Sequence, residues 1–130
     1  FYMDLDKFKP INDTLGHDIG DLLLQEAAAR LEEAVRDSDV VFRLGGDEFA
    51  AMLPECPTVE LALDVGNRVL DCVRQPYHLN GHECSIGVSI GISLFPIHGE
   101  DVDTLLKSAD AALYKVKESG RGKCAIADPV

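Results

Sequence analysis

The segment from residue 40 to residue 53 constrains the fold of this chain more than any other. Two short runs rich in β-branched, aromatic and other apolar residues, Val40–Leu44 and Phe49–Leu53, lie on either side of Gly45-Gly46-Asp47-Glu48. Glycine adopts positive φ angles without the steric penalty that other residues carry, so a Gly-Gly pair suits a tight turn. The pattern predicts a β-hairpin closed by a two-residue Gly45-Gly46 turn.

Two carboxylates directly follow this turn, and they need an explanation because acidic residues are depleted in strands. One explanation is a charged hairpin tip that protects a sheet edge from unwanted pairing. The other is a chemical site built on Asp47 and Glu48. The hairpin alone is compatible with both.

The bulk properties describe one soluble-type domain with an acidic surface. A length of 130 residues is sufficient for a hydrophobic core, and 46% hydrophobic with 27% charged residues is ordinary for a globular protein. The sequence contains no run of 18 apolar residues and no signal peptide, which predicts no membrane span. A net charge of −11 disfavours a nucleic acid polymer as partner, whereas a small phosphorylated ligand is compatible if a divalent cation accompanies it. Phe1 lies within a strand-like run without an initiator methionine, so we expect a fragment of a longer protein.

The four cysteines, Cys56, Cys72, Cys84 and Cys124, have no C-x-x-C spacing and lie in apolar surroundings. This pattern predicts buried free thiols in a reducing compartment, neither zinc ligands nor a disulfide framework. A cytoplasmic domain is the corresponding expectation, and the parent protein can still be anchored in a membrane.

Hydrophobic periodicity predicts the order β-α-α-β-β-α-β-β-α-β. The first strand alternates over residues 1–6, a short helix follows near Pro10 and ends at Gly16, and Asp18 is predicted to cap a longer helix with Asp21 in a capping-box position. After the hairpin, Thr58 is predicted to cap a helix whose apolar stripe is Leu61, Val65, Val69 and Cys72. Strands are expected at 75–79, 84–95 and 123–126, with 88–95 central, and a helix at about 105–116. The expected class is α+β, with helices packed on a mostly antiparallel sheet.

Carboxylates at the ends of predicted strands form the strongest candidate site. If the first strand pairs beside the hairpin, Asp4 and Asp47 can converge on one hard cation, as phosphoryl and nucleotidyl transfer require. Lys7-Phe8-Lys9 places backbone N–H groups and two cations at a helix start, which suits a phosphate chain. On physical grounds alone, Asp21 is explained by helix capping, Asn12 by solvation, and Lys117 by the negative end of a helix.

Five ordered signatures, taken together, resemble the GGDEF domain, the catalytic domain of diguanylate cyclases. They are Asp4-Leu5-Asp6-Lys7-Phe8-Lys9-Pro10-Ile11-Asn12-Asp13, Gly16-His17-Asp18-Ile19-Gly20-Asp21, Gly45-Gly46-Asp47-Glu48-Phe49, Ser89-Ile90-Gly91-Ile92-Ser93 and Ala109-Asp110-Ala111-Ala112-Leu113-Tyr114, followed by Lys117 to Arg121. The resemblance covers residues 1–130 as one domain, without the family's N-terminal helix and the start of its first strand. It implies a palm-like, ferredoxin-like nucleotidyl cyclase fold.

The resemblance implies that two GTP molecules condense into cyclic di-GMP, a bacterial second messenger, with release of pyrophosphate. Asp4, Asp47, Glu48 and the carbonyl of Leu5 would bind Mg²⁺ or Mn²⁺, Asp47 would help to deprotonate the attacking hydroxyl, and Lys9 would stabilise transition-state charge. Asn12 and Asp21 would recognise guanine, with His17 beside them, and Lys7, Phe8, Lys117 and Arg121 would bind the rest of the nucleotide. Since each domain would bind one GTP, catalysis would require a homodimer. The alternation of strand residues also predicts that Asp47 and Glu48 point to opposite faces.

A second site is implied by Arg36-Asp37-Ser38-Asp39, which matches the family's RxxD inhibitory motif in composition and in its spacing from Gly45. Arg36 and Asp39 would clamp the product cyclic di-GMP, with Arg68 as a weaker candidate for the same pocket. The physical alternative for Arg36 is a cation that stabilises a helix C-terminus.

Two other functions are compatible with these residues. One is a non-catalytic receptor that binds GTP or cyclic di-GMP and signals to a partner, which the retained carboxylates of the motif disfavour. The other is a nucleotide cyclase of different specificity, which Asn12 and Asp21 disfavour.

Overall fold

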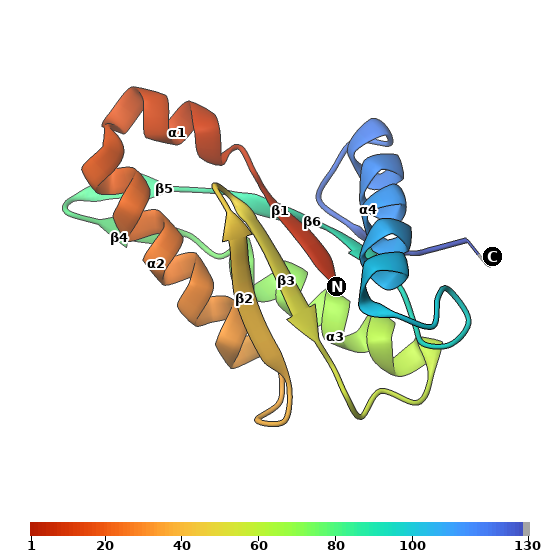
Figure 1. Ribbon diagram of the computed structural model, residues 1–130. Coiled ribbons are helices and arrows are strands. Elements are labelled where there is room, and N and C mark those ends of the chain that lie inside the picture. The colour runs from red at the N-terminus through yellow and green to blue at the C-terminus, as the bar shows by residue number, and fades with distance from the viewer. Residues whose placement is uncertain (129–130) are drawn as a thin grey trace.

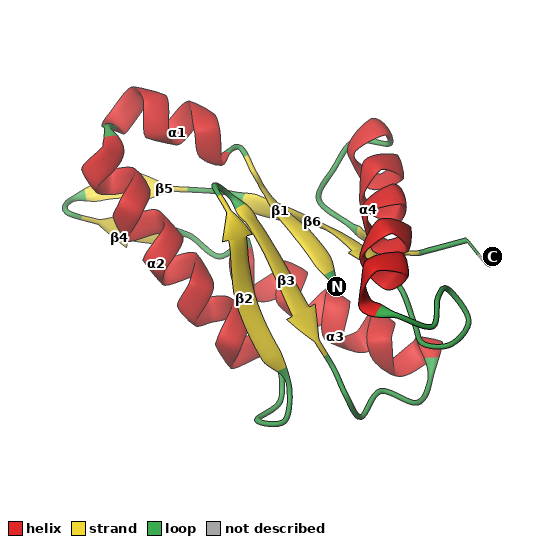
Figure 2. Cartoon of the chain, in the orientation of Figure 1, coloured by secondary structure: helices red, strands yellow, loops and turns green. Residues whose placement is uncertain are grey.

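The computed structural model describes residues 1–128, and its order of elements is the predicted one except for one additional strand between the third and fourth helices (Figures 1 and 2). The strands are β1 (Tyr2–Asp6), β2 (Val40–Gly45), β3 (Glu48–Met52), β4 (Tyr77–Leu79), β5 (His82–Cys84), β6 (Gly87–Ile92) and β7 (Cys124–Ile126). The helices are α1 (Phe8–Leu15), α2 (His17–Ala34), α3 (Val59–Val73) and α4 (Val102–Glu118).

The central sheet has five strands in the order β2-β3-β1-β6-β7. β1 lies in the middle and pairs antiparallel with both β3 and β6, and only the β6–β7 pair is parallel. The prediction of a mostly antiparallel sheet is therefore confirmed. β4 and β5 form a separate two-stranded hairpin around Asn80-Gly81, and the predicted strand 84–95 is divided between β5 and the inner strand β6.

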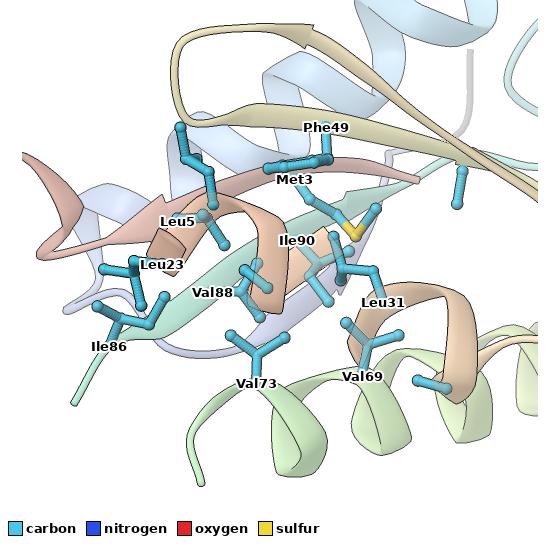
Figure 3. Packing of buried hydrophobic residues seen from close by; sticks show 14 of the residues in the cluster. Met3, Leu5, Leu23, Leu31, Phe49, Val69, Val73, Ile86, Val88 and Ile90 are labelled. Carbon is cyan, nitrogen blue, oxygen red and sulfur yellow. The ribbon is translucent and has the colours of Figure 1, made fainter. Parts of the chain in front are cut away.

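Helices cover the sheet from both sides. α2 and α3 pack on the face that carries Met3, Leu5 and Ile90, and together they form the main hydrophobic core (Figure 3). α4 packs on the opposite face so closely that a Cβ atom on Gly91 would lie 1.9 Å from the carbonyl oxygen of Ala109. Because side chains alternate along β1, this second face also carries Tyr2, Asp4 and Asp6.

The predicted helix starts are right in two places and wrong in one. Pro10 lies in the first turn of α1, and the hydroxyl of Thr58 accepts a hydrogen bond from the Leu61 N–H at 3.1 Å. Asp18 is not a cap, because α2 already begins at His17 with Gly16 before it, and Asp21 is an exposed residue inside the helix. The buried stripe of α3 is also rotated from the predicted one, and it consists of Ala62, Val65, Gly66, Val69 and Val73.

The hairpin turn is displaced by one residue from the predicted Gly-Gly pair. Gly45 pairs with Glu48, so the two residues between them are Gly46 and Asp47, and the register shifts between Arg43 and Gly45. Gly46 has a φ of +50°, which only glycine adopts without strain. The displacement places Asp47 in the turn itself, at the tip of the hairpin.

All four cysteines are free, as predicted, but only Cys84 is fully buried and the other three are half-buried. Across the part of the chain that the structure describes, no helix combines the length and the apolar composition needed to cross a bilayer.

Candidate active site

Three segments that are distant in sequence meet at one end of the sheet. They are the C-terminal end of β1, the Gly46-Asp47 turn and the C-terminal end of α4 with the turn after it (Figure 1). Asp4 lies directly opposite Glu48 in the β1–β3 pair, and the N–H of Leu5 donates to the Asp47 carbonyl at 3.0 Å. Pairing of β1 beside the hairpin therefore brings the predicted carboxylates together.

Asp4 and Asp47 form an electrostatically strained pair. Burial raises the pKa of the Asp47 carboxyl, and the negative charge of Asp4 raises it further. The Oδ1 atom of Asp4 is buried and has no hydrogen-bond partner, whereas its Oδ2 atom forms an ion pair with Lys117. Buried carboxylate oxygens are normally satisfied, so an orphan oxygen beside a second carboxylate is a candidate ligand for a cation.

Glu48 has a different environment from Asp47. The hydroxyl of Tyr2 on β1 donates to Glu48 Oε2 at 2.6 Å, and this bond to Glu48 raises the pKa of Tyr2 to about 12. Glu48 shares the sheet face of Asp4, whereas Asp47 is a turn residue to which strand alternation does not apply. The two carboxylates of the motif are thus inequivalent, although the predicted reason, opposite faces of one strand, is wrong.

These residues fit a magnesium ion that the substrate helps to bind. Within residues 1–128, no three or more His, Cys, Asp and Glu side chains are arranged to hold a metal by themselves. Mg²⁺ is commonly bound by one or two carboxylates together with water and substrate phosphates. The orphan oxygen of Asp4 and the raised pKa of Asp47 are consistent with that kind of shared site.

Two of the predicted phosphate ligands lie beside the carboxylates of β1. Lys117, in the last turn of α4, pairs with Asp4, and Arg121 lies with its Nη1 atom 3.6 Å from Asp6 Oδ1. Lys7 precedes α1 and Lys9 lies in its first turn, and both are exposed. The C-terminal end of α4 therefore brings cations to the site, whereas the approach of Lys7 and Lys9 to it stays a prediction.

The predicted guanine ligands lie together at the junction of α1 and α2. Asn12 Nδ2 is 3.4 Å from His17 Nδ1, and the Asn12 amide packs directly on the backbone of Gly20, where a Cβ atom would lie 1.9 Å from Asn12 Oδ1. Asp21 is the next residue, and it lines a groove of about 390 Å³ between α2 and the β2–β3 hairpin. Phe8 is half-buried at the start of α1.

The predicted inhibitory residues form a separate cluster after α2. The Asp39 side chain is 0% exposed and accepts from the Arg36 backbone N–H at 3.0 Å and from Arg36 Nε at 3.2 Å. Arg36 Nη2 also donates to the Glu55 carbonyl at 2.9 Å. Arg68 Nη1 donates to the Ala34 carbonyl at 3.2 Å, which places it beside the segment that carries Arg36.

Three contacts around the site were not predicted. Tyr2 holds Glu48, Gly20 makes room for Asn12, and Asp6 is buried against Ser89 and the turn after α4. The alternation of β1 indicated which face Tyr2 and Asp6 occupy, but only strand register shows what they contact.

Comparisons with known proteins show which family and which fold this chain resembles. The family model described as "Diguanylate cyclase, GGDEF domain" matches residues 1–123. The bifunctional diguanylate cyclase/cyclic di-GMP phosphodiesterase MucR of Pseudomonas aeruginosa is 43% identical over 124 residues, which are 95% of this chain and 18% of that protein. The chain thus spans under a fifth of this relative.

Solved structures are similar over almost the whole chain. The GGDEF domain of YfiN (TpbB) from Pseudomonas aeruginosa is 38% identical with a TM-score of 0.95, and the match covers 99% of this chain and 81% of that one. The GGDEF domain of DgcB from Caulobacter crescentus, solved in complex with c-di-GMP, is 28% identical with a TM-score of 0.86, covering 96% and 74%.

Proposed function

The chain belongs to the GGDEF family of diguanylate cyclase domains, and from this premise we propose that it condenses two GTP molecules into cyclic di-GMP and two pyrophosphates. The observation that carries the proposal is the Asp4–Asp47 pair, whose members repel each other and leave one buried oxygen without a partner. Nucleotidyl transfer needs such a pair, because the negative charge of the phosphates and of the leaving group must be neutralised.

In this proposal, Asp4, Asp47, Glu48 and the carbonyl of Leu5 hold Mg²⁺ or Mn²⁺. When bound, the ion supplies positive charge that offsets the phosphate oxygens and lowers the pKa of a coordinated hydroxyl. Asp47 also acts as the general base that accepts the proton of the attacking 3′-hydroxyl.

The other residues bind and orient GTP. Asn12 and Asp21 hydrogen-bond the guanine edge, because an amide can donate to its acceptor side and a carboxylate can accept from N1–H and the 2-amino group. His17 contacts the nucleotide beside them. Lys7, Phe8, Lys117 and Arg121 hold the phosphates, and Lys9 stabilises the charge of the transition state. Each domain presents one GTP, so two domains must face each other for the reaction.

The test is GTP with Mg²⁺, added to the intact protein, followed by chromatography of the products. The variant Asp47→Ala should lower cyclic di-GMP formation by roughly 1000-fold or more, since the loss of several kcal/mol of charge stabilisation is expected. Asp64→Ala, which removes an exposed carboxylate on α3, is the matched control and should retain activity. Continued synthesis by Asp47→Ala would sink the metal assignment, and GTP binding without turnover would favour a receptor.

Product inhibition at Arg36, Asp39 and Arg68 is the regulatory part of the proposal. Arg36 already donates to Asp39 and to Glu55, so a phosphate or guanine must compete with these bonds to bind there. Arg36→Ala should remove inhibition by added cyclic di-GMP while the initial rate stays unchanged. Arg74→Ala is the matched control, since Arg74 forms an equally spaced i,i+3 ion pair with Asp71 on the surface of α3. Inhibition that persists in Arg36→Ala would remove this site from the mechanism.

A further inference from the structure

Asp6 is a buried carboxylate that the proposed mechanism does not use. It is 5% exposed, and it lies two residues after Asp4 on the same face of β1. A buried charge is costly unless it is paired and hydrogen-bonded, so the contacts of Asp6 show what the fold gains from it.

These contacts all lead to the turn after α4. The hydroxyl of Ser89, itself 0% exposed, lies 2.9 Å from both carboxylate oxygens of Asp6. The backbone N–H of Gly122 lies 3.1 Å from Asp6 Oδ2 and 3.1 Å from Ser89 Oγ, so both side chains accept from it. Asp6 thereby joins β1 and β6 to a residue 116 positions further along the chain.

The turn itself needs external support. Gly120, Arg121 and Gly122 have φ angles of +117°, +65° and +69°, and Arg121 is a non-glycine residue in the left-handed region. Such a conformation costs of order 1–3 kcal/mol and persists when surrounding contacts determine it. On the helix side, the Arg121 N–H donates to the Val116 carbonyl at 3.0 Å. On the sheet side, the Gly122 N–H donates to the side chains of Asp6 and Ser89. In Figures 1 and 2 this loop leaves the end of α4 and turns back toward the sheet.

We propose that Asp6, with Ser89, is a positioning residue for nucleotide binding: it fixes the 120–122 turn so that Arg121 is presented to the triphosphate. The side chain of Arg121 is 54% exposed, and its Nη1 atom lies 3.6 Å from Asp6 Oδ1, while the backbone N–H of the next residue, Gly122, donates to Asp6 Oδ2. The inference rests on the proposed role of Arg121 in binding phosphate.

The direction in which Asp6→Asn changes nucleotide affinity separates this role from simple electrostatics. Asp6 is an anion close to Arg121, so neutralising it without any change in the turn would strengthen the binding of an anionic triphosphate. If Asp6 positions the turn, Asp6→Asn should instead weaken the binding, because the amide keeps the shape but replaces one acceptor by a donor. Loss of a hydrogen bond to a charged group corresponds to roughly a 10- to 100-fold loss of affinity.

The experiment measures binding of a non-hydrolysable GTP analogue with Mg²⁺ by calorimetry, and kcat and KM for GTP, in the intact protein. Asp6→Asn should raise the dissociation constant and KM about tenfold or more with a smaller change in kcat, and Ser89→Ala should raise them by roughly 2- to 10-fold. Ser93 directly follows β6, and its hydroxyl donates to the Leu105 carbonyl at 2.7 Å, near the N-terminal end of α4 and away from the 120–122 turn. The variant Ser93→Ala is therefore the control. Its nucleotide affinity should equal that of the wild type.

A double-mutant cycle with Arg121→Ala gives the decisive comparison. If Asp6 acts through Arg121, Asp6→Asn should have little further effect on affinity once Arg121 is removed. Tighter or unchanged binding in Asp6→Asn, or full additivity in the cycle, would overturn the inference. If Asp6→Asn fails to fold, Ser89→Ala decides. If the wild type binds the analogue but makes no product, the cyclase proposal is contradicted, and the binding data for Asp6→Asn still test the inference. If the wild type does not bind the analogue, both the cyclase proposal and the inference are overturned.

Discussion

The substitution Gly20→Ala should separate nucleotide affinity from stability. Gly20 lies in the first turns of α2, and an added Cβ atom would lie 1.9 Å from Asn12 Oδ1 and 2.9 Å from Asn12 Cγ. Contacts this short cannot persist, so one group must move. The nearest atoms all belong to the Asn12 side chain, which can rotate, so the side chain of Asn12 should leave its position while the backbone stays in place.

The expected energies oppose each other. Alanine in a helix interior is favoured over glycine by about 1 kcal/mol, and rotation of Asn12 to a poorer rotamer costs about 0.5–1.5 kcal/mol. The free energy of unfolding should therefore change by less than about 1 kcal/mol. If Asn12 reads guanine, loss of its hydrogen bond should weaken binding by about 0.5–1.5 kcal/mol, which raises KM for GTP by roughly 2- to 10-fold.

The assay is KM for GTP together with the melting temperature of each variant. Asn12→Ala should reproduce the effect of Gly20→Ala on KM. Gly66→Ala is the matched control, because it is the same change in a buried position of α3, where the new Cβ would meet Cys124 Sγ at 3.1 Å and Ile92 Cδ1 at 3.3 Å, neither of which is a proposed nucleotide ligand. An unchanged KM in Gly20→Ala would refute the role of Asn12, and a large loss of stability would refute the expectation that only its side chain moves.

Two further predictions concern stability. Gly91→Ala should destabilise the fold by about 1–3 kcal/mol or more, because the Cβ would lie 1.9 Å from the Ala109 carbonyl oxygen on α4, whereas Gly87→Ala on the same strand meets nothing closer than 3.5 Å; chemical denaturation measures both. In Mg²⁺-free buffer, Asp47→Asn should become progressively more stable than the wild type as pH rises from about 4 to 7. Burial and Asp4 raise the pKa of Asp47, so its contribution to stability is present below the unfolded pKa and is lost as pH rises through the folded pKa. Repulsion between partly exposed charges is worth about 0.2–1 kcal/mol, which is the expected difference in the free energy of unfolding at pH 7. The prediction is contradicted if the free energy of unfolding depends on pH in the same way in the two proteins.

Sequence patterns predicted each helix and each strand of the central sheet. Periodicity indicated β1, α2, α3 and α4, whose buried faces repeat at 2 or 3.6 residues, whereas α1 and β2 have no buried residue and were indicated by proline, glycine and composition. Periodicity did not predict the residue at which each element begins, since this depends on the path of the preceding loop. Aspartate is a residue type typical of a helix cap, yet α2 starts one residue before Asp18, at His17. The hairpin turn is displaced because the register shifts between Arg43 and Gly45, and nothing in the local sequence specifies that shift.

For the site, the sequence indicated which carboxylates come together but not which side chains support them. Convergence of Asp4 and Asp47 followed from the pairing of two neighbouring strands. The bond between Tyr2 and Glu48 joins residues 46 positions apart, and that between Asp6 and Gly122 joins residues 116 apart. Such contacts depend on the register of the whole sheet and on the position of α4, so no local pattern could indicate them.

Two carboxylates of β1, Asp4 and Asp6, pair with cations of the chain itself. Lys117 pairs with Asp4, and Arg121 lies beside Asp6, so both β1 carboxylates are partly neutralised without a ligand. If Asp4 binds the metal and Lys117 binds a phosphate, as proposed, the first pair must open, because the ion takes the carboxylate and the phosphate takes the ammonium. The second pair need not open, since Asp6 is also held by Ser89 and Gly122, while the Arg121 side chain is 54% exposed. One cation would thus be exchanged when substrate binds, and the other would serve as a fixed contact from the start.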